Sequence, residues 1–270
     1  MPSNYESMTG SYKLLEKNNI HYFSITQFEK FPTIIHAFST KRTGVSNLPF
    51  EALNLGYCNQ DSRENVIANR NLFFTALSVE NFKLISPVQQ HSDSFCEIEE
   101  NTPLDNITAD GLFTLQKEFI LSIQTADCFP IIIYEPSAEI IGIVHAGWKG
   151  VLNEIIIKTI TAITDKYNVK PKNLMIGIGP GIQQCCYEIK EDVLELFEKQ
   201  LPYAKKCIRY EYNKIKLDLL HLLLFQLWSL RVSHNTINYI KLCTHCNSRY
   251  FFSFRREGPT GRLMSIICKR

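Results

Sequence analysis

Two histidines and one cysteine stand where predicted strands end, a position from which side chains can converge on one point. His91 follows an apolar run, Cys128 separates two such runs, and His145 ends the last of them. Strand ends on a rigid sheet hold their side chains in nearly fixed positions. Two imidazoles and one thiolate suit zinc, and three protein ligands leave one coordination position open, as catalytic zinc sites do. These three residues are therefore candidate metal ligands.

The same residues have simpler interpretations. A histidine or cysteine at a strand end is more often packed or hydrogen-bonded in the core, and the wide separation of these three lacks the short spacing of metal fingers. Another alternative is a cysteine hydrolase with Cys128 as nucleophile and His145 as base, whose activity would survive a chelator. Spacing alone leaves these alternatives open.

The other cysteines raise a separate question. The chain has nine, and its first thirty residues lack the apolar stretch of a signal peptide, so we expect a cytoplasmic protein with free thiols or metal-bound cysteines. Cys185 and Cys186 follow a strand and a glycine turn; one thiol could line a pocket, and we expect at least one to be buried. Cys243 and Cys246 form a lone Cys-x-x-Cys pair, which favours a structural role.

The elements that must position these residues mix strands and helices irregularly. Short runs rich in β-branched residues predict strands, and helical spacing of apolar residues predicts helices. The predicted strands cover residues 33–39, 82–88, 119–123, 129–134, 140–144, 174–178, 237–242 and 250–254. The predicted helices cover residues 65–77, 151–167, 191–199 and 218–230.

Several predicted strands follow one another without an intervening helix, and a Pro-Ser turn predicts that 129–134 and 140–144 pair antiparallel. This pattern favours an α+β fold, with mixed β-sheets packed together and helices on the outside. We expect one domain over residues 1–270, with residues 1–30 as an N-terminal extension of uncertain order. The most apolar stretch, 217–230, falls short of the ~20 apolar residues that span a bilayer and predicts a buried helix.

Composition sets limits on partners. Hydrophobic residues make up 45% of the chain and charged residues 21%, which is typical of a globular protein. The 29 basic and 27 acidic side chains give a net charge of +2, so electrostatics provides no reason to expect nucleic acid or a membrane as the main partner. The sequence indicates no particular oligomeric state.

The residues around the candidate ligands form extended motifs. Thr125-Ala126-Asp127-Cys128-Phe129-Pro130 and His145-Ala146-Gly147-Trp148-Lys149-Gly150 closely resemble two signatures of the bacterial-type laccase-domain family. The resemblance extends over about residues 35–266. Its further matches are Asn54-Leu55-Gly56, Asn69-Arg70, Gln90-His91, Ala109-Asp110-Gly111, Gly179-Pro180-Gly181-Ile182, Cys185-Cys186-Tyr187-Glu188, Leu217-Asp218-Leu219, Cys243-Thr244, Phe251-Phe252-Ser253-Phe254-Arg255-Arg256 and Thr260-Gly261-Arg262.

Members of this family were first named multicopper polyphenol oxidases and are now described as zinc-dependent purine nucleoside phosphorylases with adenosine deaminase activity. The resemblance implies that His91, Cys128 and His145 bind zinc. It also implies phosphorolysis of adenosine, inosine and methylthioadenosine, with a purine nucleoside and phosphate as partners. Some members are linked to the editing of peptidoglycan precursors, and a hydrolase of that kind is an alternative.

Two other classes can be compared with the residues. A multicopper oxidase needs many imidazoles around several copper ions, whereas this chain has 7 histidines and no His-x-His pair. A metal-stabilised regulatory module would need a closed, four-ligand site. The matched motifs contain no fourth ligand for His91, Cys128 and His145, so this alternative ranks below an enzyme.

Phosphorolysis also needs cations that hold phosphate. The candidates are Lys41, Arg42, Arg70, Lys149 and Arg255. For any one of them a solvated surface charge is the simpler interpretation. Lys41 stands where the family usually has arginine, Thr43 replaces a glycine, and Lys149 replaces the arginine of a frequent Trp-Arg-Gly. Lysine lacks the planar fork that grips phosphate, so these changes bear on anion affinity. Asp127 either orients a metal ligand or caps a turn.

Overall fold

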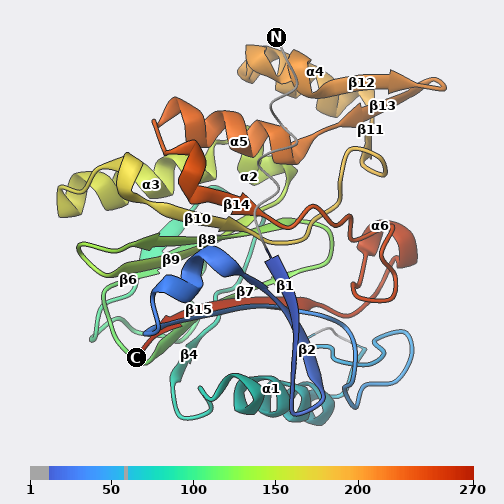
Figure 1. The fold of residues 1–270 in the computed structure, drawn as a ribbon. Coiled ribbons are helices and arrows are strands. Elements are labelled where there is room, and N and C mark those ends of the chain that lie inside the picture. The colour runs from blue at the N-terminus through green and yellow to red at the C-terminus, as the bar shows by residue number, and fades with distance from the viewer. Residues whose placement is uncertain (1–11, 58–59) are drawn as a thin grey trace.

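A computed structural model describes residues 12–57 and 60–270. Two six-stranded sheets pack face to face, with helices on both outer faces (Figure 1). The predicted α+β fold with mixed sheets and outer helices is therefore confirmed. No helix of the described residues combines the length and apolar character needed to cross a bilayer.

The first sheet contains the N-terminal and C-terminal strands. Its order is β1 (Tyr12–Lys17), β2 (Ile20–Ile25), β3 (Ile34–Ser39), β15 (Leu263–Lys269), β7 (Phe119–Thr125) and β4 (Lys83–Ile85). The β4–β7 pair is parallel and the others are antiparallel. Helix α1 (Arg63–Leu77) packs through Phe73 and Ala76 against the outer face of this sheet, and the Ser62 hydroxyl caps its first turn.

The second sheet carries two of the three candidate ligands. Its order is β14 (Ile237–Tyr239), β10 (Met175–Ile178), β8 (Phe129–Glu135), β9 (Ile140–Ala146), β6 (Gly111–Thr114) and β5 (Phe95–Glu97). The predicted antiparallel β8–β9 pair is confirmed, with Pro130 opposite His145. Because Cys128 comes immediately before β8, this register brings it beside His145.

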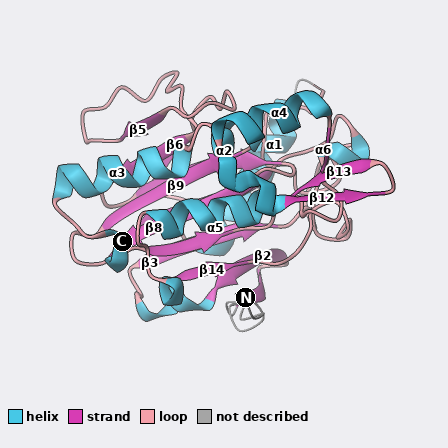
Figure 2. Cartoon of the chain, turned by 90° about the horizontal axis from the view of Figure 1, so that it is seen from above, coloured by secondary structure: helices cyan, strands magenta, loops and turns pink. Residues whose placement is uncertain are grey.

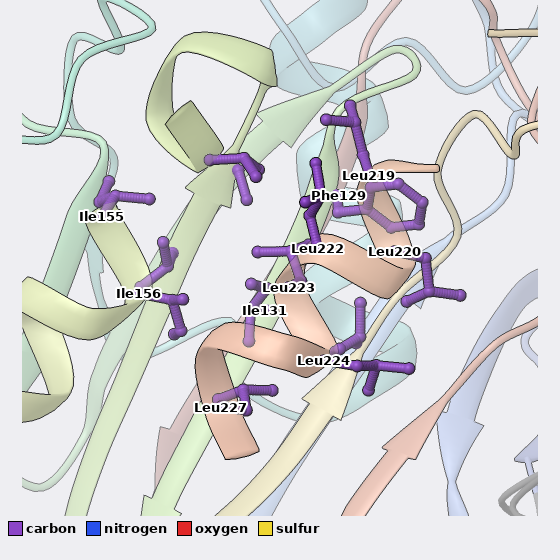
Figure 3. Close-up of a cluster of buried hydrophobic side chains, with 14 of the residues drawn as sticks. Phe129, Ile131, Ile155, Ile156, Leu219, Leu220, Leu222, Leu223, Leu224 and Leu227 are labelled. Atoms are coloured by element: carbon purple, nitrogen blue, oxygen red, sulfur yellow. The ribbon is translucent and has the colours of Figure 1, made fainter. Parts of the chain in front are cut away.

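Helices α2 (Trp148–Leu152), α3 (Ile155–Tyr167) and α5 (Leu219–Ser229) cover the outer face of the second sheet (Figure 2). Leucines of α5 and isoleucines of α3 fill the space above β8 (Figure 3). The sequence predicts one helix from residue 151 to 167, and this prediction is wrong. The helix breaks at Asn153 and Glu154, where Glu154 adopts a left-handed φ of 58°.

A smaller unit lies at one end of the molecule. It combines the sheet β11 (Glu188–Ile189), β13 (Lys214–Leu217) and β12 (Ile208–Glu211) with helix α4 (Glu191–Gln200). Short 3₁₀ turns are η2 (Thr26–Lys30), η3 (Pro171–Asn173), η4 (Pro202–Cys207) and η5 (His234–Thr236). Phe197 and Leu217 join this unit to the core under α5, so it belongs to the same domain.

Two segments differ from the sequence-based expectation. Residues 250–254 do not form the predicted strand; Phe251 and Phe252 are buried without pairing, and helix α6 (Phe254–Glu257) follows. The guanidinium of Arg256 donates to the carbonyl of Phe251, which ties this segment to a side chain in place of a sheet. Within the expected N-terminal extension, residues 12–30 form β1, β2 and η2, and residues 1–11 lie outside the described part.

Candidate metal centre and substrate pocket

His91, Cys128 and His145 converge at one edge of the second sheet, with their potential ligand atoms all within 4.8 Å of one another. The Cys128 Sγ lies 4.0 Å from Nδ1 of His91, and the two imidazole rings are 4.7 Å apart, nearly perpendicular. His145 is buried, Cys128 half-buried and His91 exposed. The trio can therefore hold a metal ion that remains accessible from one side.

Asp110, just before β6, positions both histidines. Its Oδ1 accepts a hydrogen bond from Nδ1 of His145 at 2.7 Å, which leaves Nε2 as the nitrogen available to a metal. Its carboxylate also accepts backbone N–H groups of Gln90, His91 and Ser92 at 3.1, 3.1 and 2.7 Å. Burial opposes ionisation, but the hydrogen bonds from His145 and Ser92 lower the pKa of Asp110 to about 2.

The Cys128 thiol is held in the form that binds metals. Burial alone would raise its pKa, yet the charge and hydrogen bond of His145, together with His91, lower the pKa to about 6. Burial would lower the pKa of His145, yet the negative charge of the Cys128 thiolate and the hydrogen bond to Asp110 raise it to about 9. A thiolate at neutral pH is the species that ligates zinc and other soft ions.

Gly147 leaves room for the three ligands. A β-carbon at this position would lie 2.9 Å from Nδ1 of His91 and 3.0 Å from the Cys128 Sγ. Its φ of −81° is open to any residue, so the requirement for glycine here is steric. The Gly of the His-Ala-Gly-Trp motif is thus explained by its close approach to the ligands.

Asp127 caps a turn, one of the two roles considered from the sequence, because its carboxylate accepts an N–H group in the first turn of α6. Its carboxylate accepts the Thr244 hydroxyl at 2.6 Å and the backbone N–H of Arg255 at 2.8 Å, and its own carbonyl accepts the N–H of Ile182. Its φ is 103°, a strained value for a residue with a side chain. Asp127 therefore joins three distant segments around Cys128 and contacts no histidine ligand.

A cavity of about 650 Å³ opens over the trio, within the range of about 300–1,000 Å³ that small-molecule sites occupy. Aromatic and cationic side chains line it beside the ligands: Tyr57, Trp148, Tyr187, Phe254, Arg255 and Arg262. Tyr57 and Phe254 are about half exposed and also line an adjoining hollow. The arrangement suits a flat, polar ligand that carries a negative group.

Comparison with known proteins identifies the family. Residues 35–270 match the sequence profile of the multi-copper polyphenol oxidoreductase laccase family. The chain belongs to this laccase-type family.

Several named proteins align with most of this chain. It is 30% identical to purine nucleoside phosphorylase YlmD of Bacillus subtilis over 247 residues, 87% of this chain and 88% of the relative. It is 32% identical to a Clostridium acetobutylicum protein also named purine nucleoside phosphorylase, over 86% and 91% of the two chains. The crystal structure of YlmD from Geobacillus stearothermophilus superposes with a TM-score of 0.86 at 27% identity, covering 95% and 98%.

The five cations proposed from the laccase-type motifs lie in different surroundings. Arg255 lines the cavity, with its guanidinium over the Tyr187 ring and Nη1 donating to the carbonyl of Glu188. The other four cations lie in the part of the chain that the structure describes and do not line the cavity: Lys41, Arg42, Arg70 and Lys149.

Arg70 acts one step away from the cavity. Its guanidinium stacks on Tyr57 at 4.3 Å, and Nε donates to the carbonyl of Leu55. Lys41 lies 3.9 Å from the carboxylate of Glu257, and Lys149 lies over the ring of its neighbour Trp148.

Sequence reasoning gave no role to Asp110 or Arg262, although both stand in matched motifs. Asp110 is the middle residue of Ala109-Asp110-Gly111, and Arg262 ends Thr260-Gly261-Arg262. An acidic residue between two small ones in a matched motif was the available signal for Asp110. The burial expected for Cys185 or Cys186 is wrong, because Cys185 is exposed and Cys186 only half-buried.

Proposed function

We propose that this protein is a zinc-dependent purine nucleoside phosphorylase that acts on adenosine, inosine and methylthioadenosine and also deaminates adenosine. The names of relatives aligned over most of both chains carry this proposal. The proposal assigns its substrates, a purine nucleoside and phosphate, to the cavity over His91, Cys128 and His145, and we expect it to act in the cytoplasm.

The three residues fit zinc by their chemistry. Two imidazoles and a thiolate are common zinc donors, and the space that Gly147 leaves free lies against two of them. A bound zinc ion supplies Lewis acidity at an open coordination position. The carboxylate of Asp110 fixes the tautomer of His145, which leaves Nε2 as the nitrogen that would bind the ion.

The walls of the cavity suit the rest of the substrate. Arg255 and Arg262 supply positive charge for phosphate, and Tyr57 and Phe254 offer aromatic faces for a purine. In phosphorolysis a phosphate oxygen bonds to C1′ of the ribose, the C1′–N9 bond breaks, and the released purine takes up a proton. In deamination water replaces the amino group at C6, which leaves as ammonia.

The open geometry favours an enzyme over the regulatory alternative. The group around Cys128 has three ligand residues among the described part of the chain, and a cavity of substrate size adjoins it. A structural site would be closed by four ligands. Of the seven histidines, only His91 and His145 belong to a potential metal group, which gives the copper clusters of a laccase no ligand set among the described residues.

The decisive experiment measures release of free base from adenosine, inosine and methylthioadenosine, with and without phosphate. Wild type is compared with Cys128→Ala and with Cys96→Ala, which removes a half-buried thiol outside the group of His91, Cys128 and His145. Zinc is measured on the same samples. We expect wild type and Cys96→Ala to release free base only when phosphate is present. We expect Cys128→Ala to lose the zinc of this site and to release no base.

Two results would overturn the proposal. Full activity in Cys128→Ala without zinc at this site would remove the metal centre from the reaction. A zinc-loaded wild type that releases no base from any nucleoside would exclude phosphorylase activity, and peptidoglycan precursors would be the next substrates to examine.

A further inference from the structure

Four cysteines gather at a second place, beside the cavity and apart from the His91, Cys128 and His145 trio. Cys185 and Cys186 follow the glycine turn after β10, and Cys243 and Cys246 follow β14. Their four Sγ atoms all lie within 4.8 Å of one another. The fold therefore brings a second pair, Cys185 and Cys186, beside the Cys-x-x-Cys pair, although the two pairs are far apart in the sequence.

The sulfur separations match those of a tetrathiolate site. The Cys185–Cys186, Cys185–Cys246 and Cys186–Cys246 separations are 3.7, 3.8 and 3.3 Å. Zinc–sulfur bonds of about 2.3 Å in a tetrahedron require sulfurs about 3.8 Å apart. A disulfide would need about 2.05 Å, so these sulfurs are not bonded to one another, and their separations are close to those that a shared ion requires.

The surroundings also favour an ion. The backbone N–H of Gln183 donates to the Cys243 Sγ at 3.4 Å, an interaction that stabilises a thiolate. Arg256 donates through Nη1 to the carbonyls of Thr244 and His245 at 2.8 and 2.6 Å, which fixes the turn between the two cysteines. Cys185 and Cys246 are exposed, so an ion can enter from solvent.

We propose that Cys185, Cys186, Cys243 and Cys246 form a second metal site, a structural tetrathiolate centre for zinc. Loading releases the thiol protons to solvent, because only the thiolate ligates the ion. The four-sulfur set has no open position, which distinguishes it from the three-ligand centre at Cys128.

This site braces one wall of the cavity. Gly181 and Cys243 form a parallel bridge, and the N–H of Thr244 donates to the carbonyl of Gly181 at 3.2 Å. Ile182 and Tyr187, on either side of the cysteine pair, line the cavity. Thr244, between Cys243 and Cys246, donates its hydroxyl to Asp127 next to Cys128. A metal bound to the four sulfurs would thus clamp the segments that Asp127 joins.

The test counts zinc in purified, dialysed protein by elemental analysis, using wild type, Cys128→Ala, Cys246→Ser, the double variant and Cys96→Ser as control. We expect about two zinc ions per chain in wild type and in Cys96→Ser, about one in Cys128→Ala and in Cys246→Ser, and almost none in the double variant. Because the measured quantity is metal content, the result does not depend on whether the protein acts on nucleosides.

Cobalt gives a second readout if Cys246→Ser folds poorly. Cys128→Ala loaded with Co²⁺ should show the strong sulfur-to-cobalt absorption and tetrahedral visible bands of a tetrathiolate. Three results would each overturn the proposal. The first is equal zinc content in wild type and Cys246→Ser, and the second is absence of these bands in Cys128→Ala. The third is mass spectrometry that finds the four cysteines joined as disulfides in protein purified without reductant.

Discussion

The carboxylate of Asp110 and the imidazole of His145 form a buried 2.7 Å hydrogen bond that joins the start of β6 to the end of β9. Asp110 also receives the backbone N–H of His91 from a third segment. One carboxylate therefore holds two proposed metal ligands that are 54 residues apart in the chain. Ligand orientation at this centre depends on a residue that does not contact the metal position itself.

Replacing Asp110 with asparagine should weaken zinc binding at the Cys128 centre. An amide lacks the negative charge that makes His145 a stronger ligand and cannot accept all the same N–H groups, and loss of such a partner typically costs about 10–100-fold in metal affinity. Competition with a chromophoric chelator measures this affinity. Asp93→Asn is the control, because Asp93 lies on the loop that carries His91 and pairs with Lys158 at the surface. Equal affinities in the two variants would contradict the positioning role of Asp110.

Gly147→Ala should remove metal from the same centre without unfolding the protein. The added methyl would lie 2.9 Å from His91 Nδ1 and 3.0 Å from Cys128 Sγ, closer than packed atoms approach. We expect loss of the zinc that depends on Cys128, with a melting temperature close to that of zinc-depleted wild type. Retention of that zinc at wild-type affinity would show that the ligands can shift to accommodate a β-carbon.

Local patterns predicted much of the fold. Runs such as Ile131-Ile132-Ile133 and Ile141-Gly142-Ile143-Val144 indicate buried strands, and the Pro136-Ser137 turn indicates their pairing. Strand β1 was missed because it is a largely exposed edge strand, with little apolar alternation. The break at Glu154 was missed because no glycine or proline marks it.

Contacts between distant segments account for what the sequence could not predict at the site. The types of His91, Cys128 and His145 suggested a metal, but the role of Asp110 depends on the β6–β9 register. The grouping of Cys185 and Cys186 with Cys246 likewise depends on residues about sixty positions away. Among the proposed cations, charge and motif could not distinguish Arg255, which lines the cavity, from Lys41, which pairs with Glu257.

Arg255 and Lys41 should therefore respond differently to substitution. Arg255→Met should raise the KM for phosphate roughly 10- to 100-fold, because a charge-assisted hydrogen bond contributes about 1.5–3 kcal/mol. Lys41→Met should change the KM for phosphate much less, because Lys41 pairs with Glu257 and does not line the cavity. Initial rates at varied phosphate and saturating inosine provide the comparison. A larger effect from Lys41 than from Arg255 would reassign the phosphate position.

His36 should make stability depend on pH well away from the site. It is buried on β3, and its Nε2 accepts the backbone N–H of Ile25 at 2.9 Å. Burial lowers the pKa of His36 to about 4, from 6.5 in the unfolded chain. Above pH 6.5 both states are neutral and stability is unaffected. Below it the unfolded state binds a proton first, so the free energy of unfolding decreases, by about 3 kcal/mol once pH reaches 4.

The matched variant is His36→Gln, whose amide oxygen can still accept an N–H but which does not titrate. Urea unfolding at several values between pH 7.5 and 4 should give a steeper loss of stability for wild type than for His36→Gln. All other titrating groups are common to both proteins, so the difference isolates His36. Parallel pH profiles of the two proteins would contradict the prediction, because they would mean that protonation of His36 costs the folded protein no free energy.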